Sequence, residues 1–484
     1  MSVALVSPAP TQLFLHDQNE QKTDFICSTA VRSSKLQKDL AVLGKFKKSI
    51  AFLVTAKHTF FNSLEGLKDG TPSDAAVVAL VPIACSKNDT AEQVFDLVVR
   101  YETSSCSVYG LKILNDSYYP DLRRIVDEIV KIVPKEKIQL IHTDEWTSSE
   151  LSRLREKHEL TGAYPKDIER LCCKNLVAQI AEDAKIPHAK TVFLDFRQPI
   201  NRKEFLNRII LEITKFPMFV KPNRMCGSAG IAKIANMEVL EKWLTERFQE
   251  EIPGEYVIQE FIEGEEFGVT VVLLPDGTWK PLIVDFLAGT TYQEAILKGE
   301  PLFMAALEFG KAVNGSFPNL REFTQKVIDA FRPQHPQIFC IQAFQLFPGT
   351  DQYVLNELAY RVNGDRTNAV LYPTCGISQF TAVTLAHINP NYYPTENPAW
   401  KPQIQTLVSF MQQEGTLQSQ NDCVLRTNLK SKIELKWFTN AGDSMPVPFR
   451  ISDTLVKFML YSTTEDERDA DLEWIRKNWR PDVG

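Results

Sequence analysis

The chain has little of what would place it in a membrane, on nucleic acid or outside the cell. Its longest apolar run, 75–85, contains a proline and is too short to cross a bilayer. The net charge of −7 and the pI near 5.7 argue against nucleic acid as the main partner. The nine cysteines form no C-x-x-C pair, and the N-terminus lacks the basic start and long apolar segment of a signal peptide. These absences predict a cytoplasmic protein with reduced thiols and no membrane partner.

The first 150 residues lack the glycine-rich fingerprint with which dinucleotide-binding domains hold phosphate. They nevertheless alternate strand-like and helical stretches after a loosely ordered start. Strands are expected at 12–15, 49–55, 75–83, 108–114 and 138–142, and helices at 91–101 and 119–133. Strands that alternate with helices indicate a parallel sheet covered on both faces. We therefore expect a Rossmann-like α/β domain over residues 1–150 that binds no dinucleotide.

The clearest helical pattern covers residues 165–185, where apolar side chains recur every four positions. Pro165 suits the first turn of a helix because its missing N–H would have no partner there. Lys174 lies off the apolar stripe, at an angle where a lysine is usually solvated.

A lysine and a glycine-rich turn stand together in the stretch 216–233, FPMFVKPNRMCGSAGIAK. An apolar strand ends in Lys221, and a turn with Gly227, Ser228 and Gly230 follows. Such a lysine supplies a point charge, and glycines let backbone N–H groups approach phosphate oxygens. The stretch matches neither the Walker A spacing nor G-x-G-x-x-G, and an ordinary hairpin with a solvated lysine explains it equally well.

Further paired strands follow. The segment 256–274, YVIQEFIEGEEFGVTVVLL, predicts a strand, an acidic turn and a second strand, which pairs back with 278–286. Strands at 338–346 and 353–358 form another expected hairpin, ahead of the polar loop RVNGD at 361–365. After the proline-rich segment 389–402, we expect a hairpin at 423–437, a strand at 454–460 and a last helix.

Taken in order, a lysine-bearing helix, FVKP–GSAG–K, QEFIEGEEF and NELAYR–x-x-G resemble the ATP-grasp fold. The resemblance covers roughly residues 166–380. It implies a combined α/β and α+β architecture, in which an ATP-grasp domain at 151–388 has its hinge near 259–262. A Rossmann-like domain at 1–150 would precede it, and a small lid-like α+β region at 389–484 would follow.

The resemblance also implies a site for ATP. The matched residues are Lys174, Lys221, Gly227, Ser228, Gly230, Gln259, Glu260, Ile262 and Glu266. The two lysines would contact the phosphates, and the segment 225–230 would be a mobile flap that closes over them. Adenine would stack at the hinge 259–262 with its edge against backbone groups of Glu260 and Ile262, while Glu266 would accept hydrogen bonds from the ribose hydroxyls.

Magnesium is where the sequence departs from the family pattern. The family commonly holds Mg²⁺ with an acid on one strand and a glutamate in an E-x-N-x-R motif. Here these positions are Gln342 and Glu357, and alanine replaces the asparagine. Because Mg²⁺ prefers charged oxygen ligands, a neighbouring acid, Asp285 or Asp365, could compensate. Arg361 keeps its position, where the family uses an arginine to neutralise the transferring phosphoryl group or acyl phosphate.

The resemblance implies an ATP- and Mg²⁺-dependent ligase that joins a small-molecule carboxylate to an amine through an acyl phosphate, with Arg361 and Glu357 in catalytic roles. The layout is most similar to the L-amino-acid ligases and carnosine-synthase-like enzymes. Three alternatives stay open: a purine-pathway-like carboxylase of the same fold, a degenerate ATP-binding regulator, and a scaffold that binds no nucleotide. Dimers are common in this fold, so a homodimer is one expected assembly.

Overall fold

The computed structural model describes residues 26–56, 64–83, 85, 88–102, 119–199, 201–225, 230–250, 254–289, 291, 295, 298–392, 403–448 and 453–484. Several expected features lie outside these residues: the strands at 12–15 and 108–114, the flap residues Gly227 and Ser228, and most of the proline-rich segment 389–402. Among the helices of the described residues, none combines the length and the apolar character that a membrane crossing needs.

The N-terminal region contains a parallel four-stranded sheet in the order β3-β2-β1-β4. Its strands are β1 (Ser49–Val54), β2 (Ala75–Pro82), β3 (Leu97–Tyr101) and β4 (Ile138–His142). All eight residues of β2 are buried, as expected for a strand covered on both faces. The helix predicted at 91–101 is wrong. Only a short α3 (Asp89–Glu92) forms, because Val98 and Val99 pair with the edge of β2 instead, and β-branched residues favour such a strand.

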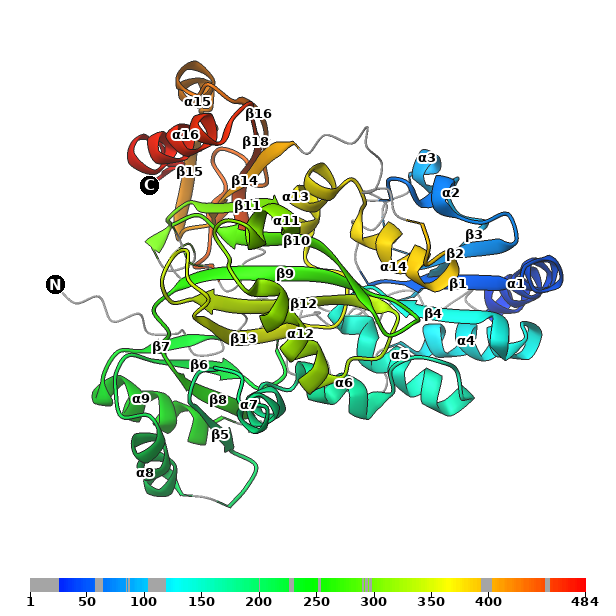
Figure 1. Ribbon diagram of the computed structural model, residues 1–484, viewed down its shortest axis with the longest axis horizontal. Coiled ribbons are helices and arrows are strands. Elements are labelled where there is room, and N and C mark those ends of the chain that lie inside the picture. The colour runs from blue at the N-terminus through cyan, green and yellow to red at the C-terminus, as the bar shows by residue number, and fades with distance from the viewer. Residues whose placement is uncertain are drawn as a thin grey trace.

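The two faces of this sheet are covered by segments far apart in the sequence (Figure 1). One face packs against α1 (Ile26–Phe46), α4 (Pro120–Ile132) and α5 (Glu145–His158). The other face packs against α2 (Leu67–Gly70) and α14 (Gln379–Ile388), which comes from beyond residue 378. We expected a loosely ordered start to the chain, but the long helix α1 forms in its second half. Leu36 and Leu40 of this helix are buried against the sheet.

The helix expected over 165–185 is two helices, α6 (Pro165–Cys172) and α7 (Lys174–Asp183). Cys173 between them has extended backbone angles, φ −83° and ψ 108°. Lys174 is therefore the first residue of a helix rather than a residue within one.

A small antiparallel sheet with two helices on one face forms the lower lobe in Figure 1. Its strand order is β5-β8-β6-β7. The strands are β5 (Thr191–Asp195), β8 (Glu255–Glu260), β6 (Met218–Pro222) and β7 (Ala232–Ile234), and the helices are α8 (Arg202–Glu212) and α9 (Met237–Phe248). Asn236 caps α9, because its side chain accepts a hydrogen bond from the N–H of Val239 at 3.0 Å.

A larger antiparallel sheet lies above that lobe and has the order β13-β12-β9-β10-β11-β14-β18-β16 (Figure 1). Its first five strands are β9 (Glu265–Leu273), β10 (Trp279–Leu287), β11 (Leu302–Glu308), β12 (Gln337–Gln345) and β13 (Tyr353–Ala359). The expected hairpin turn at 275–277 joins β9 to β10, and Gly277 there has the positive φ of 86° that a glycine accepts without strain. Helices α11 (Phe309–Val313) and α12 (Leu320–Phe331) pack on this part of the sheet.

The C-terminal residues extend the same sheet with β14 (Ile404–Met411), β18 (Thr454–Ser462) and β16 (Lys432–Trp437). A three-stranded sheet of β15 (Gly415–Ser419), β17 (Ser444–Met445) and β19 (Asp482–Val483) lies beside them, with α16 (Glu465–Asn478). The hairpin predicted at 423–437 is wrong in its first half, where α15 (Cys423–Asn428) forms. Its N–H groups and carbonyls bond locally, and only β16 pairs with β18.

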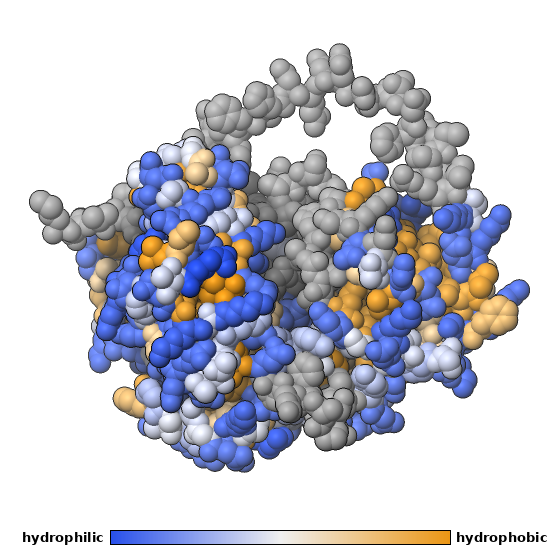
Figure 2. Space-filling view, turned by 90° about the horizontal axis from the view of Figure 1, so that it is seen from above, coloured by the Kyte–Doolittle hydropathy of each residue, from blue (hydrophilic) through white to orange (hydrophobic). Residues whose placement is uncertain are grey.

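The surface is polar over most of the face seen from above, as the charge content predicts (Figure 2). Apolar side chains are more visible on the right of that view, over the N-terminal α/β region. Exposed apolar residues of that region include Val42, Phe46 and Ile83.

Candidate functional site

Two lysines from different elements converge on one carboxylate. The Nζ of Lys174 lies 3.6 Å from Oε1 of Glu357, and the Nζ of Lys221 lies 3.7 Å from the same oxygen. Lys174 begins α7, Lys221 ends β6 in the small sheet, and Glu357 stands on β13 of the large sheet. The site therefore lies between the two sheets, and the structure brings together three residues that sequence motifs had singled out.

Each lysine also has a neutral partner that fixes its direction. Lys174 donates to the backbone carbonyl of Met225 at 2.6 Å, at the start of the flap segment. Lys221 donates to Oδ1 of Asn356 at 2.8 Å. Asn356 occupies an irregularity in the pairing of β12 and β13, since Gln342 pairs with Glu357 whereas the next residue, 343, pairs with 355. Sequence analysis missed Asn356, because no motif marks a bulge residue.

The charges in this cluster are unevenly balanced. Burial alone would raise the pKa of Glu357, but Lys174 and Lys221 outweigh it, so its pKa is lowered and the carboxylate stays ionised. Burial lowers the pKa of Lys221, whose side chain is only 9% exposed, and the attraction of Glu357 opposes that effect only in part. Two ammonium groups share one carboxylate, so the cluster can accept further negative charge.

Arg361 lies at the same site and is held from the N-terminal region. Its Nε donates to Oε2 of Glu145 at 3.1 Å, although the two residues are 216 positions apart. Glu145 is the first residue of α5, directly after β4, and the side chain of Asp144 caps that helix at the N–H of Thr147. Parallel sheets commonly bind ligands at the carboxyl ends of their strands. No sequence motif marks Glu145, and only its place after a strand of the parallel sheet relates it to a binding site.

The expected metal residues are neighbours across the sheet. Gln342 on β12 is the register partner of Glu357 on β13, so their side chains leave the same face. The row continues through Gly268 on β9 to Asp285 on β10. A Cβ on Gly268 would lie 2.9 Å from Oδ1 of Asp285, so only glycine leaves that space open. Asp365, the other candidate for compensation, has its side chain outside the described residues.

Two carboxyl groups of this face have too little positive charge around them to keep their pKa values low. Burial raises the pKa of Glu266 to about 7, and Lys221 offsets this only in part. Burial also raises the pKa of Asp285 to about 7, and its Oδ1 is buried with no hydrogen-bond partner in the part of the chain that the structure describes. Across the described residues, no three His, Cys, Asp or Glu side chains lie close enough to hold a metal ion by themselves.

The expected adenine hinge joins β8 to β9. Gln259 is buried and donates to Oγ1 of Thr191 at 3.0 Å, and Glu260 accepts from the N–H of Lys190 at 2.8 Å. Ile262 is half-buried at the turn. These contacts fix the hinge to β5, so its backbone groups are held in place.

The glutamates of the acidic turn after the hinge differ in exposure, since Glu263 and Glu265 are exposed and Glu266 is half-buried. On the flap side, only Gly230 of the three predicted flap residues lies within the described part. It has a φ of +69°, and a Cβ there would lie 2.8 Å from the ring of Pro222. Glycine is therefore required where the flap returns to β7.

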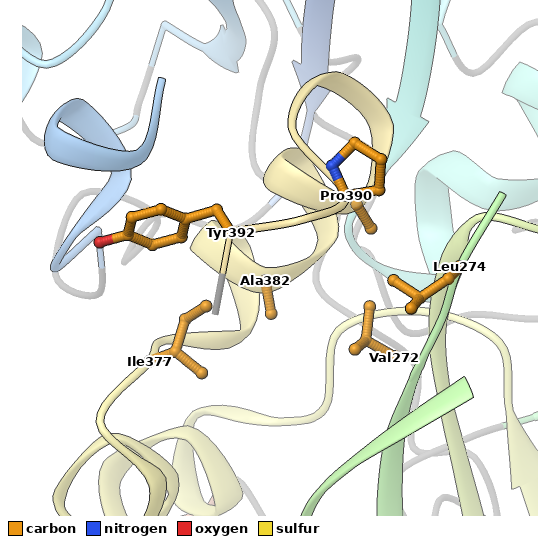
Figure 3. Close-up of a pocket in the computed structure, with 7 residues that line it drawn as sticks. Val272, Leu274, Ile377, Ala382, Pro390 and Tyr392 are labelled. Atoms are coloured by element: carbon orange, nitrogen blue, oxygen red, sulfur yellow. The ribbon is translucent and has the colours of Figure 1, made fainter. Parts of the chain in front are cut away.

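The hollow drawn in Figure 3 is a different feature. Its lining is Val272, Leu274, Ile377, Ala382, Ala386, Pro390 and Tyr392. It is small and lies between α14 and the end of β9, away from the lysines. Because its lining side chains offer no charge, it does not suit a phosphate group.

A family model described as the D-Ala–D-Ala ligase C-terminus matches residues 180–284. This segment runs from within α7 to β10 and includes Lys221, the hinge and Glu266. The D-alanine–D-alanine ligase of Prochlorococcus marinus (strain MIT 9312) is 31% identical over 102 residues, which are 20% of this chain and 28% of that relative. The enzyme of the same name from Staphylococcus carnosus (strain TM300) is 27% identical over 155 residues, 30% of this chain and 43% of that relative. The chain thus matches less than half the length of these curated relatives.

Solved structures match far more of the chain. The L-amino acid ligase from Bacillus licheniformis has a TM-score of 0.61 and 13% identity, with 90% of this chain and 99% of that one covered. A carboxyaminoimidazole ribonucleotide synthase from Aspergillus clavatus, complexed with ATP, has a TM-score of 0.58 and 15% identity, with 90% and 99% covered. The N5-carboxyaminoimidazole ribonucleotide synthetase from Thermotoga maritima has a TM-score of 0.55 and 17% identity, with 89% and 98% covered.

The chain therefore has the ATP-grasp fold, as its motifs predicted. Within that fold it resembles carboxylate–amine ligases, since the family model, both curated relatives and the Bacillus licheniformis structure are of that kind. The roles of individual site residues, the domain limits and the assembly stay predictions.

Proposed function

We propose that this protein is an ATP-dependent ligase that joins a small carboxylic acid, such as an amino acid, to an amine. The observation that carries the proposal is the convergence of Lys174 and Lys221 on Glu357, next to Arg361. Two lysines share the carboxylate of Glu357 there, and the nearby Arg361 is paired with Glu145, so cations outnumber their paired carboxylates and the site suits a polyanion. The ligases named above add support, because both the family model and the relatives are of this class.

The proposed reaction has two steps. An oxygen of the carboxylic acid attacks the γ-phosphorus of ATP, the bond to the bridging oxygen breaks, and ADP leaves. The amine nitrogen then attacks the carbonyl carbon of the acyl phosphate. The bond from that carbon to the phosphate oxygen breaks, phosphate leaves, and the amine releases a proton to solvent. Catalysis of this kind depends mainly on positioning and on neutralising negative charge.

The residues of this chain would share that work. Lys174 and Lys221 would bind the phosphates of ATP, and Arg361 would hold the transferring phosphoryl group with its planar, permanently charged guanidinium. Glu145 would keep Arg361 directed at the site. The hinge at Gln259, Glu260 and Ile262 would bind adenine, and Glu266 the ribose.

Mg²⁺ fits this site as a sparsely ligated ion. Mg²⁺ bound with ATP commonly takes one or two carboxylates and leaves its other positions to phosphate and water. Glu357 and the amide oxygen of Gln342 would hold it, and the unpartnered oxygen of Asp285 and the raised pKa values of Asp285 and Glu266 mark a face that lacks positive charge. When bound, the ion would neutralise charge on the phosphates.

An ADP-release assay tests the proposal. Purified protein is incubated with ATP and a panel of amino acids, alone and in pairs, with and without Mg²⁺, and ADP is measured over time. Because every amino acid carries both a carboxylate and an amine, we expect ADP release with at least one amino acid or pair of amino acids when Mg²⁺ is present, and none without amino acids or without Mg²⁺. The Arg361→Ala variant should still bind ATP, although less tightly than the unaltered protein, and should release little ADP.

One observation favours a second candidate, an ATP-binding protein without turnover. Gln342 stands where the family commonly has an acid, so the metal site has one carboxylate fewer. ATP binding by calorimetry with no ADP release for any acceptor would establish this alternative and contradict the ligase. If ATP neither binds nor raises the melting temperature, both are wrong.

A further inference from the structure

One buried asparagine joins the two elements that carry the lysines. Asn223 follows Lys221 by two residues at the end of β6 and is only 2% exposed. Its backbone carbonyl accepts the N–H of Lys174 at 3.1 Å, and its side-chain Oδ1 accepts the N–H of Asn175 at 3.0 Å. These are the first two N–H groups of α7, which a helix cannot satisfy internally. Asn223, which directly follows β6, therefore caps the start of α7.

The cap explains why the helix expected over 165–185 breaks where it does. Cys173, at the N-cap position of α7, makes no capping hydrogen bond with its own side chain. Its Sγ instead lies 3.2 Å from Nδ2 of Asn223. In a continuous helix the N–H groups of Lys174 and Asn175 would bond within the helix. Here they point to Asn223, so the chain turns at Cys173 and Lys174 faces the site.

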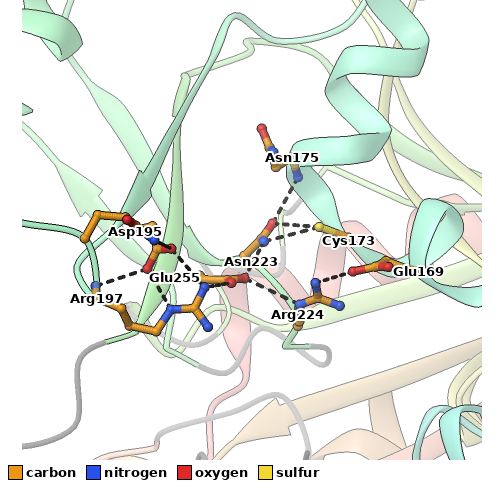
Figure 4. A network of polar contacts seen from close by, with 9 residues as sticks. Glu169, Cys173, Asn175, Asp195, Arg197, Asn223, Arg224 and Glu255 are labelled. Atoms are coloured by element: carbon orange, nitrogen blue, oxygen red, sulfur yellow. Dashed lines mark hydrogen bonds and ion pairs between the residues drawn. The ribbon is translucent and has the colours of Figure 1, made fainter. Parts of the chain in front are cut away.

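The orientation of the Asn223 amide is itself fixed. Its Nδ2 donates to Oε2 of Glu255 at 2.8 Å, which leaves Oδ1 turned toward α7 (Figure 4). Glu255 is held in turn by Arg197 and Arg224, and Arg224 reaches Glu169 on α6 at 2.5 Å. The network thus spans α6, α7, β6 and β8, and it surrounds Asn223 rather than the lysine ammonium groups.

The position of Lys174 at the start of α7 also indicates that this lysine serves the site rather than the helix. A cation on the first residue of a helix is disfavoured by the helix dipole, and the first turn of α7 carries no acidic residue to offset it. A lysine at this position therefore does not stabilise α7. It does gain a defined position relative to Lys221, because Lys221 lies two residues before Asn223 and the backbone N–H of Lys174 bonds to the carbonyl of Asn223.

We propose that Asn223 is a positioning residue that holds Lys174 and Lys221 at the spacing needed to bind the phosphates of ATP. The inference rests on the proposed function in one respect, that the two lysines bind nucleotide. Asn223 does not touch the substrate. It acts by fixing the start of α7 against the end of β6.

Four variants test this role by calorimetry with ATP. Asn223→Ala should weaken ATP binding at least tenfold. The matched control, Asn236→Ala, removes the cap of α9 at Val239 in the same lobe, so it should cost similar thermal stability and leave ATP affinity within twofold. Asn223→Asp combined with Glu255→Gln exchanges donor and acceptor between the two side chains, so it should restore ATP affinity that Asn223→Asp alone loses to charge repulsion.

The outcomes separate cleanly. Equal ATP affinity in Asn223→Ala and Asn236→Ala would overturn the inference, and so would a folded double variant that binds ATP no better than Asn223→Asp. The double variant decides the matter if Asn223→Ala does not fold.

Amide hydrogen exchange supplies a readout that needs no nucleotide. The N–H of Asn175, which bonds to the Asn223 side chain, should exchange at least tenfold faster in Asn223→Ala than in the unaltered protein, and unchanged exchange of this N–H contradicts the inference. If the unaltered protein binds no ATP, the proposed function fails, while the exchange result still decides whether Asn223 holds the two elements together.

Discussion

Lys221 is the residue on which the proposed phosphate site depends most directly. It is buried, its Nζ lies near Glu357 and Asn356, and burial lowers its pKa. Lys221→Ala removes one charge-assisted contact to phosphate, so we expect ATP binding to weaken by about 1–3 kcal/mol. Calorimetry measures this change. Lys137→Ala is a matched control, because Lys137 donates to the carbonyl of Gly44 far along the chain in the N-terminal region. Unchanged ATP affinity in Lys221→Ala would remove this residue from the site.

Gln342 is the residue at which the metal site departs from the family pattern. Because Gln342 and Glu357 are register partners on one face, Gln342→Glu adds a second carboxylate beside the first. We expect Mg²⁺ to bind at least threefold more tightly in the presence of ADP, measured by Mg²⁺ titration at constant ionic strength. Gln345→Glu on the same strand is the control, since its side chain faces the carbonyls of Ser316 and Thr350 instead. Mg²⁺ affinity that does not rise would mean that another group already supplies the charge.

At the scale of elements, the start of α5 determines where Glu145 stands. Asp144 is buried and accepts hydrogen bonds from Thr55, Ala56 and Thr147, so one side chain joins β1 to α5. Asp144→Ala should lower the free energy of unfolding by about 2 kcal/mol or more, because it removes a helix cap and leaves buried donors unpaired. Urea denaturation measures this. Loss below 0.5 kcal/mol, the size of an ordinary surface substitution, would contradict the role given to Asp144.

Whether a feature of the fold or of the site can be predicted from the sequence depends on how far apart its contacting residues lie along the chain. Lys221, Glu357 and Arg361 stand in local motifs, and β1, β2 and β4 of the N-terminal sheet are local apolar runs, so these features were predictable, whereas β3 was predicted as a helix. Glu145 meets Arg361 across 216 positions, and Asn223 caps a helix almost 50 positions before it. The spacing of apolar residues in these segments gives no information about such a distant contact. The break at Cys173 was hidden for the same reason, since the spacing of apolar residues continues through it.

At the scale of the whole molecule, buried histidines link the N-terminal sheet to the rest. His142 at the end of β4 donates from Nε2 to the carbonyl of Tyr360 and accepts at Nδ1 from Arg155. His387 on α14 lies 3.2 Å from Oε1 of Gln139. Burial and the nearby Arg155 lower the pKa of both histidines to about 3.

These lowered pKa values predict a loss of stability in mild acid. The raised pKa values of Asp285 and Glu266 act in the opposite direction, because the folded chain binds protons at these carboxyl groups below pH 7 before the unfolded chain does. Below about pH 6.5 the unfolded chain binds protons at the two histidines and the folded chain does not, so the histidines' contribution to the free energy of unfolding falls as the pH decreases toward 3. Two such groups contribute at most about 3 kcal/mol per pH unit. Between pH 6.5 and 5 we expect the unfolding midpoint in urea to decrease in the unaltered protein relative to His387→Gln, a comparison in which the contribution of the two carboxyl groups cancels. Equal slopes for the two proteins would show that His387 is not buried as a neutral side chain.

The position of α14 has a consequence for how this protein is made. One face of the N-terminal sheet has apolar side chains, among them Leu53 and Val77, that are covered by Val383 and its neighbours on α14. During synthesis β1 to β4 leave the ribosome first, but the helix that covers them leaves more than two hundred residues later. The nascent N-terminal sheet must therefore wait with one apolar face open, and it is in this interval that a chaperone would be needed.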